Sequence, residues 1–251
     1  MLLTIDIGNT TTGAAIFNKD IIVSKNKLLT PGEISVLFLK SLIKKVYRDK
    51  IDSISVSSVV PFVDNSLKES AKKLFGTEPV FIDYLTPTGV KLKIDNPSEM
   101  GADRIADYMG ALSLVPPPLI ILDSGTATTF DIINKKYEYI GGAIFPGIEL
   151  AIKSLAQNTA KLEMIKFEVP ESIFGTNTVN SIRSGIYFSY IGGLSFMINE
   201  YKKKLGSGCS VIATGGLSRY FRGKIKEVDI YEPDLIYFGL KKIFEDSVRE
   251  K

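Results

Sequence analysis

IDIGNTTTG, residues 5–13, places an apolar strand, a carboxylate and a glycine-rich turn next to one another. The apolar residues around Ile5 predict a buried strand, and a carboxylate such as Asp6 at its end is costly unless it has a partner. Gly8, Asn9 and the threonines that follow predict a tight turn with free backbone N–H groups. A carboxylate beside such donors is suited to holding a cation and a phosphate.

A second copy of this pattern lies about half a chain length further on. Residues 119–133 read LIILDSGTATTFDII, again an apolar run, an aspartate, a glycine and then threonines. The matched pairs are Asp6 and Asp123, Gly8 and Gly125, Thr11 and Thr128, and Thr12 and Thr129. One copy would be an ordinary hairpin with a chance match, whereas two copies predict two β-hairpins that hold one polyphosphate between them.

Composition excludes several kinds of chemistry. The chain has no histidine and a single cysteine, Cys209, so histidine-based triads and His- or Cys-ligated zinc sites are excluded. Acid–base work therefore falls to carboxylates, lysine, tyrosine or the thiol. The net charge is +3 with scattered lysines, which does not indicate a nucleic-acid partner. Without a membrane-spanning apolar run or a basic region before the first strand, we expect a cytoplasmic protein with no membrane partner.

Apolar periodicity predicts alternating strands and helices in both halves of the chain. We expect strands near 119–145, a long helix from about 178 to 204, and a last helix near 234–246. The proline run 116–118 predicts a joint between the halves. The expected fold class is therefore α/β, with mixed sheets flanked by helices. No Walker motif and no strand-linked GxGxxG occurs, so a nucleotide would bind on the hairpins.

Several motifs together resemble the type III pantothenate kinase family. They are DIGNT (6–10), GADR (101–104), DSGTATTFD (123–131), GGAIFPGIE (141–149), GTNTVNSIRSG (175–185) and ATGG (213–216). The resemblance implies the actin, sugar-kinase and heat-shock ATPase superfamily, with two ribonuclease-H-like halves, here 1–115 and 119–251, around a central cleft. It implies ATP-dependent phosphorylation of pantothenate to 4′-phosphopantothenate, the first step of coenzyme A synthesis. It also implies a homodimer with the substrate site at the interface.

On the nucleotide side, the resemblance implies that Asp6 holds Mg²⁺ and that Asp123 binds a monovalent cation, K⁺ or NH₄⁺. The implied ATP and phosphate contacts are Gly8, Asn9, Thr10, Thr11, Thr12, Gly125, Thr126 and Gly215. The alternative for either aspartate is a turn cap, which is common for Asp beside Gly but does not explain the duplication.

On the acceptor side, the resemblance implies that Asp103 is the general base that deprotonates the pantothenate hydroxyl. Its place in the first turn of a helix favours the ionised form. The apolar stripe Ile105, Met109 and Leu112 lies on a different face from Asp103 and Asp107, so neither carboxylate is expected in the core. The implied substrate contacts are Gly101, Ala102, Arg104, Thr178 and Ile94. For Thr178 a helix N-cap is the alternative role.

Ile94 is a departure from the family, which usually has a tyrosine two residues before the Asn-Pro pair. The exchange removes a hydroxyl and leaves an apolar contact. Gly185, Gly192 and Gly193 in the long helix predict close packing, against a partner subunit or within one chain. Two other functions stay open: a small-acid or sugar kinase of the same superfamily, or a non-catalytic ATP-binding regulatory protein on this scaffold.

Overall fold

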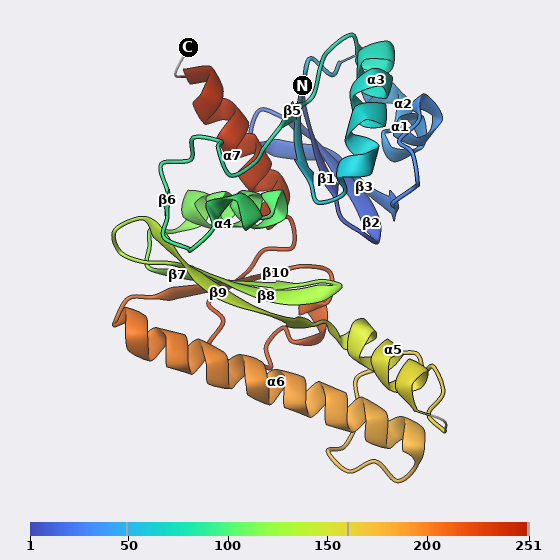
Figure 1. The fold of residues 1–251 in the computed structure, drawn as a ribbon, viewed down its shortest axis with the longest axis vertical. Coiled ribbons are helices and arrows are strands. Elements are labelled where there is room, and N and C mark those ends of the chain that lie inside the picture. The colour runs from blue at the N-terminus through green and yellow to red at the C-terminus, as the bar shows by residue number, and fades with distance from the viewer. Residues whose placement is uncertain (49, 160, 250–251) are drawn as a thin grey trace. The chain divides into compact units, whose positions relative to one another are not determined.

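The computed structural model describes residues 1–48, 50–159 and 161–249, and the chain divides into two compact units. The first unit combines Met1–Val115 with the C-terminal segment from Asp234, and the second is Pro116–Pro233. Each unit is an α/β layer structure with a mixed sheet and flanking helices (Figure 1), as the sequence predicts. Among the described residues no helix is long and apolar enough to cross a membrane.

The first unit is built on a sheet with strand order β3-β2-β1-β4-β5. Its strands are β1 (Leu2–Ile7), β2 (Thr11–Asn18), β3 (Ile21–Leu29), β4 (Ser53–Ser58) and β5 (Val80–Phe81), with β6 (Lys91–Leu92) later in the chain. Its helices are α1 (Val36–Leu42), α2 (Lys45–Arg48), η1 (Pro61–Val63), α3 (Asp64–Phe75), η2 (Pro97–Glu99), α4 (Ala102–Leu114) and α7 (Leu235–Arg249).

Alternation along β1 and β4 assigns the two faces of this sheet. Leu3, Ile5 and Val56 point into a core closed by α1 and α3. The opposite face is lined by small polar residues, and it is buried as well: Thr4 is fully buried, and the Ser55 hydroxyl donates to the Leu240 carbonyl of α7 at 3.2 Å. Small side chains on this face let a helix approach the strands closely.

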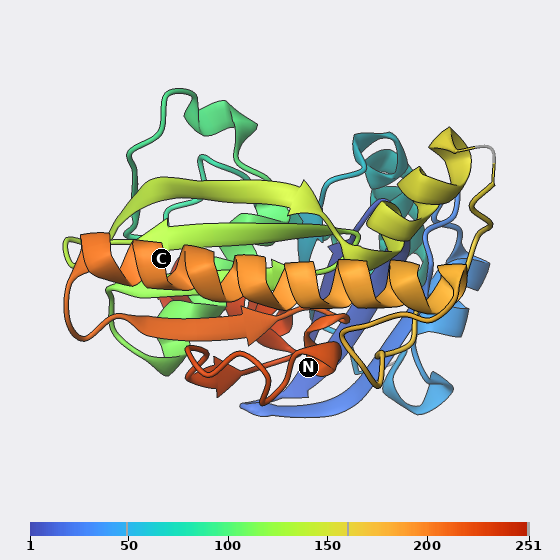
Figure 2. The same ribbon diagram turned by 90° about the horizontal axis from the view of Figure 1, so that it is seen from below.

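The second unit repeats the same topology. Its strands are ordered β9-β8-β7-β10-β11, with β7 antiparallel to β8 and parallel to β10, as β1 is to β2 and β4. The elements are β7 (Leu119–Ser124), β8 (Ala127–Ile133), β9 (Glu138–Pro146), α5 (Ile148–Asn158), α6 (Thr178–Leu205), β10 (Ser210–Thr214), η3 (Ser218–Tyr220) and β11 (Ile230–Tyr231). The long helix α6 covers one face of the sheet (Figure 2).

The C-terminal helix α7 belongs to the first unit, whereas the sequence-based division placed it in the half from 119 to 251. Two glycines bring α7 against α4. A Cβ on Gly239 would lie 1.7 Å from the Ala106 carbonyl oxygen, and a Cβ on Gly110 would lie 2.3 Å from the Leu235 carbonyl oxygen. The backbones therefore touch, and this contact outweighs the position of α7 in the sequence.

Candidate active site

The predicted first hairpin is formed by β1 and β2, and Asp6 is the penultimate residue of β1. Asp6 is half-buried, while Asn9 and Thr10 are exposed at the tip of the turn. The Gly8 N–H donates to the Thr11 carbonyl at 3.0 Å and closes the turn. The hairpin thus places the half-buried Asp6 carboxylate next to an exposed polar turn.

Thr12 differs from the phosphate-contacting role that the resemblance implies. Its side chain is fully buried, and its hydroxyl is 3.1 Å from that of Thr30. The Thr30 hydroxyl donates to the Gly8 carbonyl at 2.6 Å, and the Thr30 N–H donates to the Thr10 carbonyl at 3.0 Å. Thr12 and Thr30 therefore hold the turn from inside, and sequence patterning gave no signal for Thr30.

Tyr237 of α7 lies beside Asp6, which the sequence also did not indicate. Asp6 is the cross-strand partner of Gly13, and a Cβ on Gly13 would stand 2.1 Å from the Tyr237 hydroxyl. Burial, with the negative charges of Asp6 and Asp234, raises the pKa of Tyr237 far above its usual value. Tyr237 therefore stays a neutral phenol next to the carboxylate, and a side chain at position 13 would displace its hydroxyl.

Asp103 lies in the first turn of α4, as predicted. Its Oδ1 accepts the Arg104 N–H at 2.8 Å, and a Cβ on Gly101 would meet this oxygen at 2.4 Å, so a side chain at 101 would displace the carboxylate. Burial raises the pKa of Asp103, and the Arg104 N–H and guanidinium only partly oppose this rise. Desolvation therefore opposes the ionised form that the place of Asp103 in the first turn of the helix favours.

Asp107 corrects a second expectation about α4. Because Asp107 lies off the stripe of Ile105, Met109 and Leu112, the sequence predicts that it stays out of the core, yet it is only 4% exposed. Every residue from Ile105 to Ala111 is buried, because α4 is enclosed on more than one side. Helical periodicity identifies an apolar stripe but does not reveal that the opposite face is also covered.

Val59 connects the hairpin to the N-terminus of α4. Its N–H donates to the carbonyl of Ile7, directly after Asp6, at 3.0 Å. Its side chain lies 3.8 Å from the point where a Cβ on Gly101 would stand. Val59 is therefore bonded to the strand end that carries Asp6, and its side chain lies beside Gly101, the residue before α4. Both segments lie in the first unit.

The second hairpin, β7 and β8, carries Asp123 at the same place in its first strand. Gly215, with φ +85°, lies against it: a Cβ there would be 2.1 Å from Asp123 Oδ1 and 2.5 Å from the Ser124 carbonyl oxygen. Only glycine fits there, so the ATGG motif is where the backbone closes over the carboxylate. Thr126 is exposed in the turn and Gly125 is half-buried.

The expected pairing of threonines is wrong by one residue. Across the strands Ile7 faces Thr12 and Ser124 faces Thr128, so Thr128 corresponds to Thr12 and not to Thr11. The cause is the turn, which has one residue fewer in the second hairpin. An ungapped comparison cannot register this change.

The remaining substrate candidates are placed by local structure. Ile94 is half-buried just after β6, Ala102 is buried and Arg104 is half-buried at the start of α4. Thr178 is the first residue of α6 and is exposed, but the N-cap is Asn177, whose side chain accepts the Asn180 N–H at 2.9 Å. The capping alternative for Thr178 is therefore wrong. Thr178, Asp123 and Gly215 belong to the second unit, and Asp6, Asp103 and Ile94 to the first.

Comparison with known proteins identifies the family. A sequence model described as type III pantothenate kinase matches residues 2–200. The chain belongs to the type III pantothenate kinase family. It is 37% identical to the type III pantothenate kinase of Streptomyces coelicolor, with 99% of both chains covered. Family membership thus agrees with the resemblance carried by the motifs.

Solved structures share the fold at low sequence identity. A Baf-family protein from Campylobacter jejuni superposes with a TM-score of 0.60 at 21% identity, covering 98% of this chain and 99% of the other. A ROK hexokinase from Thermus thermophilus superposes with a TM-score of 0.50 at 12% identity, covering 100% and 99%. The fold of this pantothenate kinase family member is thus shared with a sugar kinase.

Proposed function

We propose that this family member transfers the γ-phosphoryl group of ATP to the hydroxyl of pantothenate, giving 4′-phosphopantothenate and ADP. The observation that carries the assignment of roles is the position of Val59: its N–H bonds to the strand end that carries Asp6, and its side chain lies beside Gly101, directly before the helix that carries Asp103. Phosphoryl transfer depends mainly on positioning and charge neutralisation, so a phosphate site and an acceptor base on one rigid unit suit this reaction.

The first hairpin is the proposed phosphate site. Backbone N–H groups and hydroxyls of Asn9, Thr10 and Thr11 would face the phosphates, while the Gly8 N–H closes the turn and Thr12 supports it from the core. Among the described residues there is no group of three or more His, Cys, Asp or Glu that could hold a metal. A single carboxylate, Asp6, fits Mg²⁺, which binds through one or two carboxylates with phosphates and water. When bound, Mg²⁺ would neutralise the phosphate charge.

Asp103 is the proposed general base. In the transfer, the pantothenate hydroxyl oxygen bonds to the γ-phosphorus, the bond to the β–γ bridging oxygen breaks, and Asp103 accepts the hydroxyl proton. Burial raises the pKa of Asp103, which strengthens it as a proton acceptor. Arg104, beside it, is suited to the pantothenate carboxylate because a guanidinium pairs with carboxylates in a two-pronged geometry. Ile94 would supply an apolar contact.

The second hairpin is the proposed site for the monovalent cation and for contacts to the nucleotide. Asp123 would hold K⁺ or NH₄⁺, and the exposed Thr126 would contact ATP, with Gly215 beneath. The close approach of the Gly215 backbone to Asp123 supports this role. A side chain at position 215 would occupy the space beside Asp123 Oδ1, and glycine keeps that space open. A weakly hydrated cation is a suitable partner for such an oxygen.

The exposed face of α6 supports the proposed homodimer. Ser189, Gly192, Gly193 and Phe196 are exposed and follow helical spacing, and Phe196 is 66% exposed. A Cβ on Gly192 or Gly193 would meet no described atom within 4 Å, so these glycines do not serve packing inside the described chain. The two glycines leave a flat surface beside the exposed ring of Phe196, and such a surface is suited to packing against α6 of a second copy of the chain. Thr178, at the start of α6, would then reach the neighbouring substrate site.

The assay that tests the function is ADP release with ATP, Mg²⁺ and pantothenate, in K⁺ or in Na⁺. We expect turnover that requires pantothenate and is faster in K⁺. Turnover with a sugar or another small acid in place of pantothenate would show that the protein is a kinase with a different acceptor. ATP binding without turnover on any of these acceptors would reject catalysis in favour of a regulatory protein. For the dimer, Gly193→Leu should lower the sedimentation mass to that of a monomer.

A further inference from the structure

The two hairpin turns are held by the same main-chain hydrogen bonds. The residue after the third strand donates its N–H to the last residue of the turn: Thr30 to the Thr10 carbonyl at 3.0 Å, and Gly147 to the Thr126 carbonyl at 2.9 Å. This equivalence means that each turn is fixed to the end of its neighbouring strand. It also makes the side chains at the two sites directly comparable.

In the first hairpin a threonine on this same strand end supplies a hydroxyl relay. Thr30 donates its hydroxyl proton to the Gly8 carbonyl at 2.6 Å, so the buried Thr12 hydroxyl must donate to Thr30. The relay lies entirely within the hairpin and its neighbouring strand.

The second hairpin cannot use the same device. Position 147 is glycine, and a Cβ there would lie 2.3 Å from the Gly125 carbonyl oxygen and 2.5 Å from that of Thr126. A side chain with a hydroxyl is therefore excluded where the first hairpin has Thr30. The buried hydroxyl of Thr128, the counterpart of Thr12, still needs a partner.

Tyr190 of α6 supplies that partner. Its hydroxyl donates to the Pro146 carbonyl at 2.9 Å and is hydrogen-bonded to the Thr128 hydroxyl, which must act as the donor. The relay of the first hairpin is thus rebuilt, with a threonine donating to a hydroxyl that donates to a backbone carbonyl. The difference is that the middle hydroxyl comes from a helix and not from the strand end.

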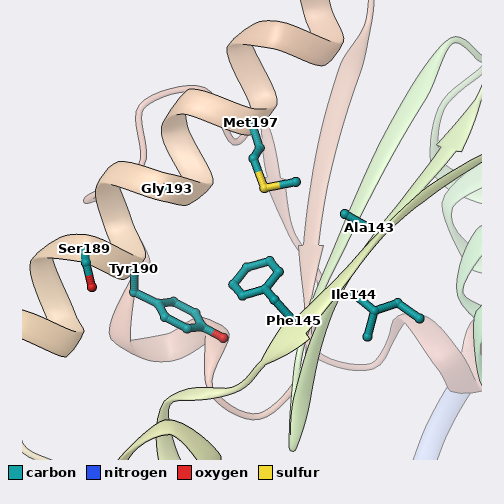
Figure 3. Close-up of a pocket in the computed structure, with 7 residues that line it drawn as sticks. All are labelled: Ala143, Ile144, Phe145, Ser189, Tyr190, Gly193 and Met197. Carbon is teal, nitrogen blue, oxygen red and sulfur yellow. The ribbon is translucent and has the colours of Figure 1, made fainter.

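The surroundings of Tyr190 fix its ring. It packs against Phe145 with ring centroids 5.3 Å apart and stacks on Phe221 at 5.4 Å, and its side chain is buried. Figure 3 shows the ring below α6, beside Phe145, at the edge of a hollow of about 430 Å³ between α6 and β9. Burial, together with the charge of Asp123, raises the pKa of Tyr190, so its hydroxyl keeps its proton.

We propose that Tyr190 is a positioning residue that fixes the Gly125–Thr126 turn, and with it Asp123, and thereby couples this turn to α6. The proposal rests on the proposed role of that turn in binding ATP and the monovalent cation. A displacement of α6 would reach the second turn through this hydroxyl. Tyr190 touches no reacting atom.

The test compares Tyr190→Phe with the matched control Tyr187→Phe. Tyr187 is also buried on α6, and its hydroxyl also donates to a backbone carbonyl, that of Tyr220 at 3.2 Å, away from the turn. Hydrogen exchange is measured at the Gly125 and Gly147 amides without ligand. The KM for ATP, the half-activating K⁺ concentration, kcat and the KM for pantothenate are then measured on all three proteins.

We expect Tyr190→Phe alone to exchange these two amides faster and to raise the KM for ATP and the half-activating K⁺ about five- to tenfold, as the loss of a hydrogen bond implies. The pantothenate KM should change less than about twofold. Equal exchange in the two variants, or an unchanged KM for ATP, would overturn the proposal. If the wild-type protein phosphorylates a different acceptor, pantothenate is not its substrate and the proposed function is wrong. The hydrogen exchange and the KM for ATP would still decide the role of Tyr190.

Discussion

Replacing Gly239 by alanine tests the contact that assigns α7 to the first unit. In an exposed helix this substitution stabilises by about 1 kcal/mol, because alanine is the better helix former. Here the new Cβ would stand 1.7 Å from the Ala106 carbonyl oxygen and 2.9 Å from the Gly110 nitrogen, both in the backbone of α4. Ordinary contacts begin near 3.4 Å, so the two helices must move apart by more than 1 Å.

Overpacking of this kind costs about 1–3 kcal/mol or more, so we expect a net loss of about 2 kcal/mol after the gain in helix propensity. For a chain of this size that corresponds to a fall in Tm of about 4–8 °C. Because Asp103 lies in the first turn of α4, a displacement of this helix should also lower kcat, by about tenfold to a hundredfold for a shift near 1 Å. Thermal unfolding and steady-state kinetics well below Tm measure the two effects.

Gly185→Ala in α6 is the matched control, since a Cβ there meets no described atom within 4 Å. It should raise Tm slightly, because only the gain in helix propensity remains. The decisive comparison is the sign of the stability change in the two variants. If Gly239→Ala is as stable as the control and fully active, then α4 and α7 are not in backbone contact, and the reasoning about the first unit fails.

Three further predictions follow from single residues. Asp103→Asn should lower kcat by about 10²–10⁴-fold yet raise Tm at pH 7. Because the pKa of Asp103 is raised, its carboxyl group holds a proton more tightly in the folded protein than in the unfolded chain, and the ionised carboxylate destabilises the fold at pH values above the folded pKa. This destabilisation is lost in the wild type as the pH falls through the folded pKa towards the unfolded one. Thr30→Val, with Thr30→Ser as control, should raise the KM for ATP about fivefold in steady-state assays. Cys209 should resist iodoacetamide at pH 8 by mass spectrometry, because burial raises the pKa of its thiol to about 11.

Local patterns predicted much of this molecule. The two hairpins, the long helix α6 and the placement of Asp6 and Asp123 near strand ends all follow from apolar runs and turn residues in one short window. These features depend on neighbours in sequence. The resemblance to a family added roles, which a single chain cannot reveal by periodicity alone.

What sequence patterns missed depends on contacts between distant segments. Asp107 is buried although it lies off the apolar stripe, and helical periodicity does not record that this side of α4 is enclosed too. Helix α7 joins the first unit because Gly110 and Gly239 permit backbone contact, although each glycine alone is only an unfavourable helix residue. Thr30 and Tyr190 act through hydroxyls that reach a turn from elsewhere in the fold.

The comparison of the two hairpins indicates what the duplication has kept. The turn lengths differ by one residue and Thr30 has no side-chain counterpart at Gly147, yet the N–H bonds from the third strand and from each turn glycine are the same. Because backbone geometry is common to both, each turn would present its donors to an anion in the same way. The side chains have instead diverged to support that geometry. In the first hairpin the hydroxyl relay comes from the neighbouring strand end, and in the second it comes from α6, so a change in α6 should reach the second turn through Tyr190.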